Sequence, residues 1–150
     1  MIAYLDASAL VKRYVVERGT RETVALAATA EMIATAIVSR AAVAAALAKG
    51  VRIGIVKDDI ARNARRRFGH DWPDFVRIPV TEALVARADA LAWEQELRGY
   101  DAVQLASALT WQESVGEEIV LATFDRQLWD AAKRTGLQVW PDAIQQPETR

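Results

Sequence analysis

The alternation of short apolar runs with longer helical segments constrains this fold more than any other feature of the sequence. The first run, Ile2-Ala3-Tyr4-Leu5, is too short for a helix and is followed at once by a helical pattern. We predict strands at residues 2–5, 32–35, 75–78, 118–122 and 137–139, and helices at 8–16, 20–30, 39–49, 55–68, 81–97, 102–112 and 126–134. Strands that alternate with helices favour a parallel sheet covered by helices, so we expect an α/β fold with three α/β/α layers.

Polar residues and glycines mark the expected ends of these helices. The residues that favour N-caps are Ser39, Thr81, Asp101 and Asp125, and the glycines expected to stop helices are Gly50, Gly99 and Gly136. The sequence has no repeat, linker or low-complexity block, so we predict one domain over residues 1–143 and a frayed tail over 144–150. The N-terminus lacks a signal-peptide pattern and the apolar runs are too short to span a bilayer, which favours a cytoplasmic protein.

The composition restricts the chemistry that an enzyme could use. The sequence contains no cysteine, which excludes disulfides, thiolate zinc sites and cysteine nucleophiles. The single histidine, His70, excludes mechanisms that need a histidine pair, and no Gly-x-Ser-x-Gly elbow accompanies it. If this chain is an enzyme, carboxylates must carry the catalysis.

Three aspartates stand at comparable places beside the expected strands. Asp6 directly follows the first strand, Asp125 follows the fourth strand, and Asp101 opens the helix that precedes the fourth strand. Ligands bind beyond the carboxyl ends of parallel strands, so these acids are candidates for one catalytic cluster. The alternative is structural, because aspartate is among the best N-cap residues. Asp6 is the strongest candidate, because Ser8 is available to cap the helix that follows it.

A cluster of carboxylates implies a compensating charge. At about 5 Å and an effective dielectric constant near 20, two carboxylates repel each other by roughly 3 kcal/mol. A retained proton or a divalent cation relieves this repulsion. Oxygen ligands without sulfur or imidazole favour Mg²⁺ or Mn²⁺, which can activate water for attack on a phosphodiester.

Three motifs carry a resemblance to a known family. "YLDASALVKRY", "RGYDAVQLASAL" and "ATFDRQL", in this order and at these distances, resemble the PIN-domain ribonuclease toxins of the VapC type. The resemblance implies an Mg²⁺- or Mn²⁺-dependent endoribonuclease, a homodimer, and a VapB-type antitoxin that inserts a segment at the acidic site. Asp6 and Asp101 match the family's metal-binding acids, Asp125 matches the acid that completes the pocket, and Thr123 matches a small polar residue near it.

One position departs from the family pattern. The family usually has Ser-x-x-Glu-Val after the second strand, whereas this chain has "SRAAV", with Ala42 in place of the glutamate. If Ser39 is the N-cap, residue 42 takes the N3 position, where a capping box also favours glutamate. Ala42 belongs either to a natural, weakened member or, as we favour, to an engineered chain whose toxicity was reduced for expression. In both cases we expect weak metal binding and poor cleavage.

Basic residues suggest a place for RNA, although the net charge is only −1. The candidate RNA contacts are Lys12, Arg13, Arg62, Arg65 and Arg66. An ordinary solvated helix face explains the same pattern equally well. Trp93 and Trp111 fall at apolar helix positions, where core or dimer contacts are expected in preference to base stacking.

Two other functions compete with the nuclease. A non-catalytic module would use the acidic pocket only to receive an arginine from a partner, and Ala42 would then be native. A phosphatase of the Asp-x-Asp kind would need an acid at position 8, which is serine. A receiver domain would need paired early acids and a lysine after a late strand, and the sequence has neither.

Overall fold

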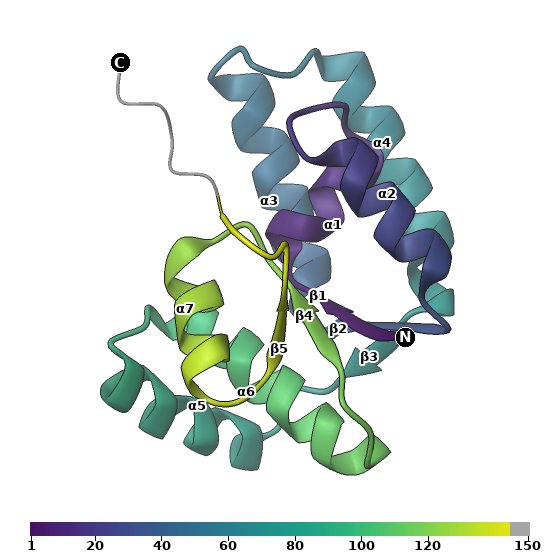
Figure 1. Cartoon of the computed structure of the whole chain (residues 1–150). Helices are drawn as coiled ribbons and strands as arrows, with labels where there is room; N and C mark the ends of the chain where they lie inside the picture. Colours follow the sequence, from purple (N-terminus) through teal and green to yellow (C-terminus); the bar gives the residue numbers. More distant parts are fainter. Residues whose placement is uncertain (145–150) are drawn as a thin grey trace.

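Five parallel strands form one sheet in the computed structural model, which describes residues 1–144 (Figure 1). The strands are β1 (Ile2–Leu5), β2 (Met32–Ala36), β3 (Val76–Ile78), β4 (Val120–Ala122) and β5 (Gln138–Trp140). The helices are α1 (Ala7–Tyr14), α2 (Thr20–Thr29), α3 (Ser39–Arg52), α4 (Asp58–Asp71), the short 3₁₀ turn η1 (Trp72–Asp74), α5 (Glu82–Gln95), α6 (Gly99–Val115) and α7 (Arg126–Arg134). The strand order is β3-β2-β1-β4-β5, with every pair parallel, so the expected α/β fold is confirmed.

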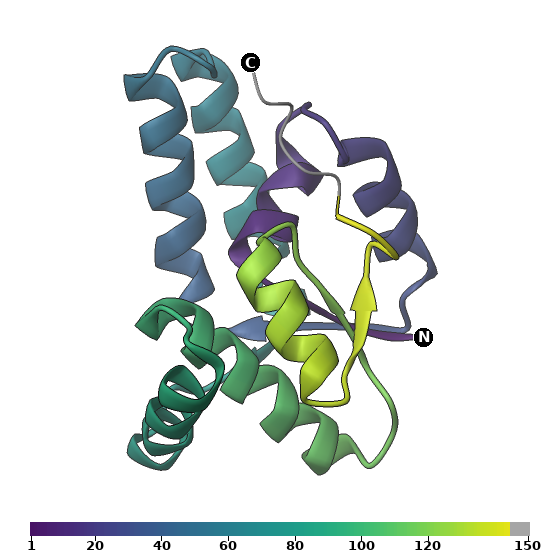
Figure 2. The same cartoon turned by 60° about the vertical axis from the view of Figure 1, so that its left-hand side comes forward.

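Alternate residues of β1 face opposite layers of helices. Ile2 and Tyr4 belong to the core that contains residues of α5, α6 and α7, whereas Ala3 and Leu5 belong to the core that contains residues of α1, α3 and α4. Figure 2 shows the paired helices α3 and α4 on one side of the sheet and α5 with α6 on the other. All four residues of β1 are buried, as expected for a central parallel strand covered on both faces.

A buried network of polar side chains joins α6 to the start of α3. Gln104 is fully buried and donates from Nε2 to Ser39 Oγ at 3.0 Å and to Tyr100 Oη at 2.7 Å. The Thr35 hydroxyl donates to the same Ser39 Oγ at 2.7 Å, and the Tyr4 hydroxyl donates to Gln104 Oε1. Unpaired polar groups are costly in a core, so this satisfied network fixes the two helices relative to each other and to the sheet.

Several helix ends differ from those expected from the sequence. Ser39 is not an N-cap but the first residue of α3, and Val38 before it provides no side-chain cap. The reason is that the Ser39 hydroxyl is held in the buried network. Asp101 is not an N-cap either, because α6 already begins at Gly99, which opens this helix instead of ending α5. Gly50 lies inside α3 and does not stop it.

The other predicted helix ends are confirmed. The Thr81 side chain accepts a hydrogen bond from the Leu84 amide at 3.1 Å, and the Asp125 side chain accepts one from the Leu128 amide at 2.9 Å. Gly136 follows the end of α7 with a φ of 92°, a left-handed conformation that glycine adopts without strain. These two caps depend only on neighbours in the sequence, which is why local patterns predicted them correctly.

Of the two tryptophans expected in core or dimer contacts, Trp111 is in the core and Trp93 is not, so a dimer contact of Trp93 stays a prediction. Trp111 is 6% exposed and belongs to the core, whereas Trp93 on α5 is 88% exposed and packs in no core. Residues 145–150, most of the tail that we expected to be frayed, lie outside the described residues. Within residues 1–144, no helix combines the length and the apolar character that a bilayer crossing requires.

Candidate active site

Asp6 lies at the carboxyl end of the central strand β1, beside the end of β4. The two strands align Leu5 with Ala122, and the Asp6 amide donates to the Ala122 carbonyl at 3.2 Å. The chain builds the sheet outward from β1 on both sides, so this edge is the switch point at which open α/β sheets bind ligands. The same alignment brings Thr123, the residue after β4, next to Asp6.

Three donors hold the Asp6 carboxylate, which is 4% exposed as a residue. Oδ1 accepts from Ser8 Oγ at 2.7 Å and from the Ala9 amide at 3.0 Å, and Oδ2 accepts from Thr123 Oγ1 at 2.6 Å. Asp6 is therefore the N-cap of α1, and the interpretation that left this role to Ser8 was wrong. The Ser8 hydroxyl instead orients Asp6 and accepts a hydrogen bond from the Phe124 amide at 2.9 Å.

Asp101 and Asp125 converge on one guanidinium group. Arg98 donates from Nε to Asp101 Oδ2 at 3.1 Å and from Nη2 to Asp125 Oδ2 at 2.9 Å. Asp101 is 5% exposed and lies in the first turn of α6. The side chain of Arg98 is 72% exposed, so it covers the two acids from the solvent side.

Burial and the nearby charge of Asp125 raise the pKa of Asp6 and of Asp101. Burial raises the pKa of Asp6 from 3.8 to about 6 in spite of its three donors, and the charge of Asp125 adds to the increase. Burial also raises the pKa of Asp101, again with a contribution from Asp125, whereas Arg98 lowers it. The three aspartates come from separate segments of the chain, and Asp125 raises the pKa of both Asp6 and Asp101, so we describe them as one acidic cluster.

The donor set of this acidic cluster fits a hard divalent cation. It offers carboxylate and hydroxyl oxygens, which are the ligands that Mg²⁺ and Mn²⁺ prefer. The guanidinium of Arg98 already lies between two of the carboxylates, which indicates that positive charge is favoured there. Among the described residues no group of three acidic, cysteine or histidine side chains is close enough to hold one ion. A cation bound in this arrangement would therefore use two carboxylates, with water completing its shell.

Ala42 is half-buried near the start of α3, the helix that begins beyond the carboxyl end of β2. Because α3 starts at Ser39, residue 42 is the fourth helical residue and does not take the N3 position that we expected. The methyl group of Ala42 cannot coordinate an ion. That a catalytic carboxylate is missing at this position stays a prediction.

Three arginines of α4 and one of α3 line a cleft of about 750 Å³. The basic side chains of this arginine cleft are Arg40, Arg62, Arg65 and Arg66, and the apolar ones include Ile37, Ala41, Ala44 and Phe68. Arg62 also forms an ion pair with Asp58 at 2.7 Å on the exposed face of α4. The structure thus brings three of the five candidate RNA contacts together.

The other two candidate RNA contacts lie outside this cleft. Lys12 Nζ is 4.4 Å from the centre of the Phe124 ring and donates to the Arg18 carbonyl at 2.7 Å. The guanidinium of Arg13 is 5.7 Å from the centre of the Phe75 ring. Both cations are engaged with aromatic rings, so their surroundings differ from those of Arg62, Arg65 and Arg66 in the cleft.

Sequence reasoning missed Arg98 and Arg40. The spacing of Arg98, three residues before Asp101, is that of a helical ion pair, but this signal appears only when α6 is known to start at Gly99. Arg40 contributes to the cleft because α3 and α4 pack side by side, a contact that no local pattern reveals.

Comparisons with known proteins agree with this architecture. Residues 3–134 match the PIN domain. The chain is 34% identical to the ribonuclease VapC49 of Mycobacterium tuberculosis over 145 residues, which cover 93% of this chain and 95% of that protein. Among solved structures, PAE2754 from Pyrobaculum aerophilum superposes with a TM-score of 0.64 at 24% identity, over 93% of this chain and 83% of that one. VapBC2 from Rickettsia felis, bound to a DNA fragment from their promoter, gives a TM-score of 0.62 at 15% identity, over 93% and 97%. The chain therefore belongs to the PIN-domain family and, within it, to the VapC group.

Proposed function

We propose that this chain is a metal-dependent endoribonuclease that acts as the toxin of a toxin–antitoxin pair. The observation that supports the proposal is the electrostatic influence of Asp125 on both Asp6, at the switch point of the sheet, and Asp101, with the Arg98 cation between Asp101 and Asp125. Membership of the VapC group supports the same activity, since the relative VapC49 is named a ribonuclease. RNA substrates would place its action in the cytoplasm.

The residues of the acidic cluster would divide the work. Asp6 and Asp101 would hold Mg²⁺ or Mn²⁺, which lowers the pKa of water and offsets charge on the phosphate. Ser8 and Thr123 orient the Asp6 carboxylate through their hydroxyl groups, so its oxygens are positioned before any ligand binds. Arg98 is exposed and can exchange its carboxylate contacts for an RNA phosphate once a cation neutralises the acids.

The arginine cleft between α3 and α4 is our proposed path for the RNA backbone. Arg40, Arg62, Arg65 and Arg66 line it, and no acidic side chain is among the described residues of its lining. Ala41 and Ala44 also line the cleft, so it runs along α3 beside position 42. Phosphate contacts of this kind bind RNA without reading its sequence.

We further propose that Ala42 weakens cleavage. The test is Ala42→Glu, with Ala42→Gln as a matched control of nearly equal size and no charge. If a carboxylate is missing, Ala42→Glu cleaves a structured RNA faster than the parent chain in Mg²⁺ or Mn²⁺, by at least tenfold, whereas Ala42→Gln does not. Equal cleavage by the three proteins would refute the proposed impairment.

A non-catalytic module is the alternative, favoured by the fact that Arg98 already satisfies two of the acids. Calorimetric titration with Mn²⁺ at pH 8 separates the two functions, because only a cation site gives saturable heat. Asp101→Asn should abolish that heat, while Asp89→Asn, an exposed acid on α5, should leave it unchanged. A parent chain that gives no heat, and an Ala42→Glu chain that neither binds Mn²⁺ nor cleaves RNA, would leave only the binding module.

We also propose a VapB-type antitoxin as partner and a homodimer as the assembly. The exposed apolar side chains Ile53, Ile55 and Ile60 at the turn between α3 and α4 offer a surface for protein contact. Co-expression with the product of a neighbouring small gene tests the antitoxin, by co-purification and loss of cleavage. Light scattering tests the homodimer, which should have twice the 16.6 kDa mass of the chain.

A further inference from the structure

A second cleft has a volume of about 680 Å³. It lies between the loop before α2 and the residues that follow β4 and β5. Its characteristic side chains are two aromatic rings, two cations and two carboxylates: Phe124, Trp140, Lys12, Arg18, Glu22 and Asp142. We call it the aromatic cleft.

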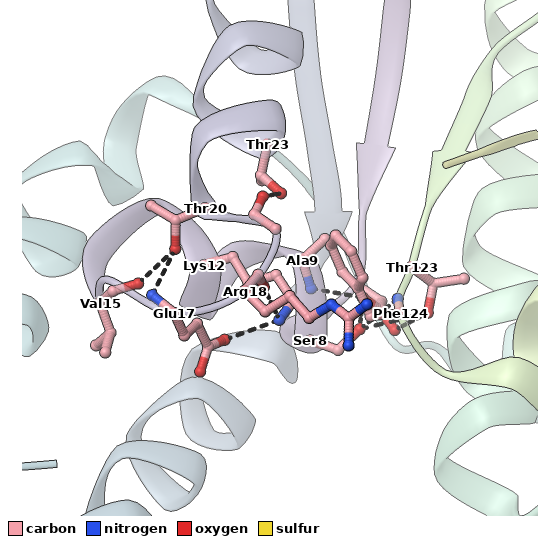
Figure 3. A network of polar contacts seen from close by, with 12 residues as sticks. Ser8, Ala9, Lys12, Val15, Glu17, Arg18, Thr20, Thr23, Thr123 and Phe124 are labelled. Carbon is pink, nitrogen blue, oxygen red and sulfur yellow. Dashed lines mark hydrogen bonds and ion pairs between the residues drawn. The ribbon is translucent and has the colours of Figure 1, made fainter. Parts of the chain in front are cut away.

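The aromatic cleft is connected to the acidic cluster through a single hydroxyl group. The Phe124 amide donates to Ser8 Oγ at 2.9 Å (Figure 3). Ser8 Oγ in turn donates to Asp6 Oδ1 at 2.7 Å. Phe124 also stands between Thr123, which donates to Asp6, and Asp125. Because Phe124 lines the cleft and is flanked in the chain by Thr123 and Asp125, an RNA strand at the acidic cluster could reach the cleft with a neighbouring nucleotide.

The two aromatic rings are held in fixed positions. Their centroids are 5.6 Å apart and their planes are nearly perpendicular, at 88°. Lys12 covers the Phe124 ring, and a Cβ atom on Gly19 would come within 2.9 Å of the same ring, so the loop before α2 packs closely on it. Trp140 is half-buried and lines the cleft, so an aromatic surface is available to a ligand.

The charges in the aromatic cleft do not suit a phosphate. The Lys12 side chain is only 14% exposed and is paired with the Glu17 carboxylate at 3.1 Å and the Arg18 carbonyl at 2.7 Å. The remaining cation, Arg18, faces a lining that also contains Glu22 and Asp142. A flat, uncharged group with both donors and acceptors matches this balance better than an anion does.

We propose that the aromatic cleft takes one unpaired nucleobase of the RNA strand whose phosphate lies at the acidic cluster. The volume is within the range of about 300–1,000 Å³ that is usual for small-ligand sites. Proteins that recognise single-stranded RNA stack splayed bases on aromatic side chains, and such stacking tolerates every base because each has a π face. The inference rests on the proposed ribonuclease function and adds a base-binding subsite to it.

The test uses a short single-stranded RNA that carries the fluorescent base 2-aminopurine at each position in turn. Binding is followed by anisotropy of a terminal dye with Ca²⁺ in place of Mg²⁺, and stacking by quenching of the 2-aminopurine emission. We expect quenching at one or two adjacent positions.

Trp140→Leu should remove this quenching and weaken binding by about tenfold, the usual loss for one stacked base. Trp140→Phe, which keeps an aromatic face and guards against misfolding, should bind within about twofold of the parent. Trp93→Leu, an exposed tryptophan on α5, should change nothing.

The outcomes separate this inference from the proposed function. If Ala42→Glu cleaves RNA but adding Trp140→Leu to it alters neither quenching nor affinity, the base subsite is wrong and the ribonuclease stands. If Ala42→Glu neither binds nor cleaves RNA, the ribonuclease proposal fails and the base subsite with it. A Trp140→Phe chain that loses affinity as strongly as Trp140→Leu would assign Trp140 a packing role and would also overturn the inference.

Discussion

Replacing Asp6 with asparagine should stabilise the metal-free protein at pH 8. Because burial raises the Asp6 pKa from 3.8 to about 6, the folded protein keeps a proton that the unfolded chain releases between these pH values. The resulting contribution favours folding at low pH and is lost as the pH rises through about 6. Above that pH, holding the ionised carboxylate in the fold costs about 3 kcal/mol, since one pKa unit corresponds to about 1.4 kcal/mol.

Asparagine has nearly the same shape and carries no charge, so it removes this cost. The amide nitrogen of asparagine is a donor at a place where a carboxylate oxygen of Asp6 accepts a hydrogen bond. The loss of that one hydrogen bond reduces the gain in folding free energy by about 1 kcal/mol. We therefore expect Asp6→Asn to gain about 2 kcal/mol at pH 8, which raises Tm by roughly 4–8 °C for a chain of this size. At pH 4 the gain should vanish or become a slight loss.

Thermal and urea unfolding in EDTA at pH 4, 5 and 8, followed by circular dichroism, measures this effect. Most of the difference should develop between pH 4 and pH 6. Asp89→Asn, at an exposed position, provides the control and should show no such pH dependence. Added Mg²⁺ should stabilise the parent chain and not Asp6→Asn. The reasoning is refuted if Asp6→Asn is as destabilised at pH 8 as at pH 4, because the ionised carboxylate would then be stabilising.

Three further changes test other parts of the structure. Arg98→Gln removes the cation that competes for the acids, so Mn²⁺ should bind more tightly at pH 8 by calorimetry, and weaker binding would contradict this. Arg65→Ala with Arg66→Ala should lower the salt slope of RNA binding by about 1.4, at about 0.7 per lost phosphate contact, and an unchanged slope would leave only a solvated helix face. Gly19→Ala should lower Tm by about 4–8 °C, because a φ of 90° and contact with the Phe124 ring cost about 2 kcal/mol, and an unchanged Tm would refute this strain.

The strands of the sheet were predictable because each one is a short apolar run that can be recognised from its own residues and their near neighbours. The run Ile2–Leu5 is bounded by a helical pattern, and the structure confirms it without a change in length. Asp125 as a helix cap was predictable for the same reason, since its partner is the amide of Leu128, three residues away. Features set by near neighbours are the ones that a single sequence expresses.

The features that were missed depend on distant partners. Serine is a favoured N-cap residue, but the Ser39 hydroxyl accepts a hydrogen bond inside the core from Gln104, which is 65 positions away in the sequence. The position of Asp101 depends on a helix that begins at Gly99, three residues earlier than predicted, with Arg98 extended before it. That shift turns an expected cap into a buried acid with a raised pKa. The local sequence pattern therefore predicted which strand ends hold the site, whereas the exact positions of its side chains depend on tertiary contacts.

The bridge from Gln104 to Ser39 has a consequence for how any restored activity would behave. Asp101 precedes Gln104 by three residues and Ala42 follows Ser39 by three, so each end of the bridge lies one helical turn from a position of interest. A carboxylate placed at position 42 would stand at a separation from Asp101 that is set when the chain folds. Substrate binding would then not have to bring these two carboxylates together, so RNA cleavage by such a variant should begin without a lag.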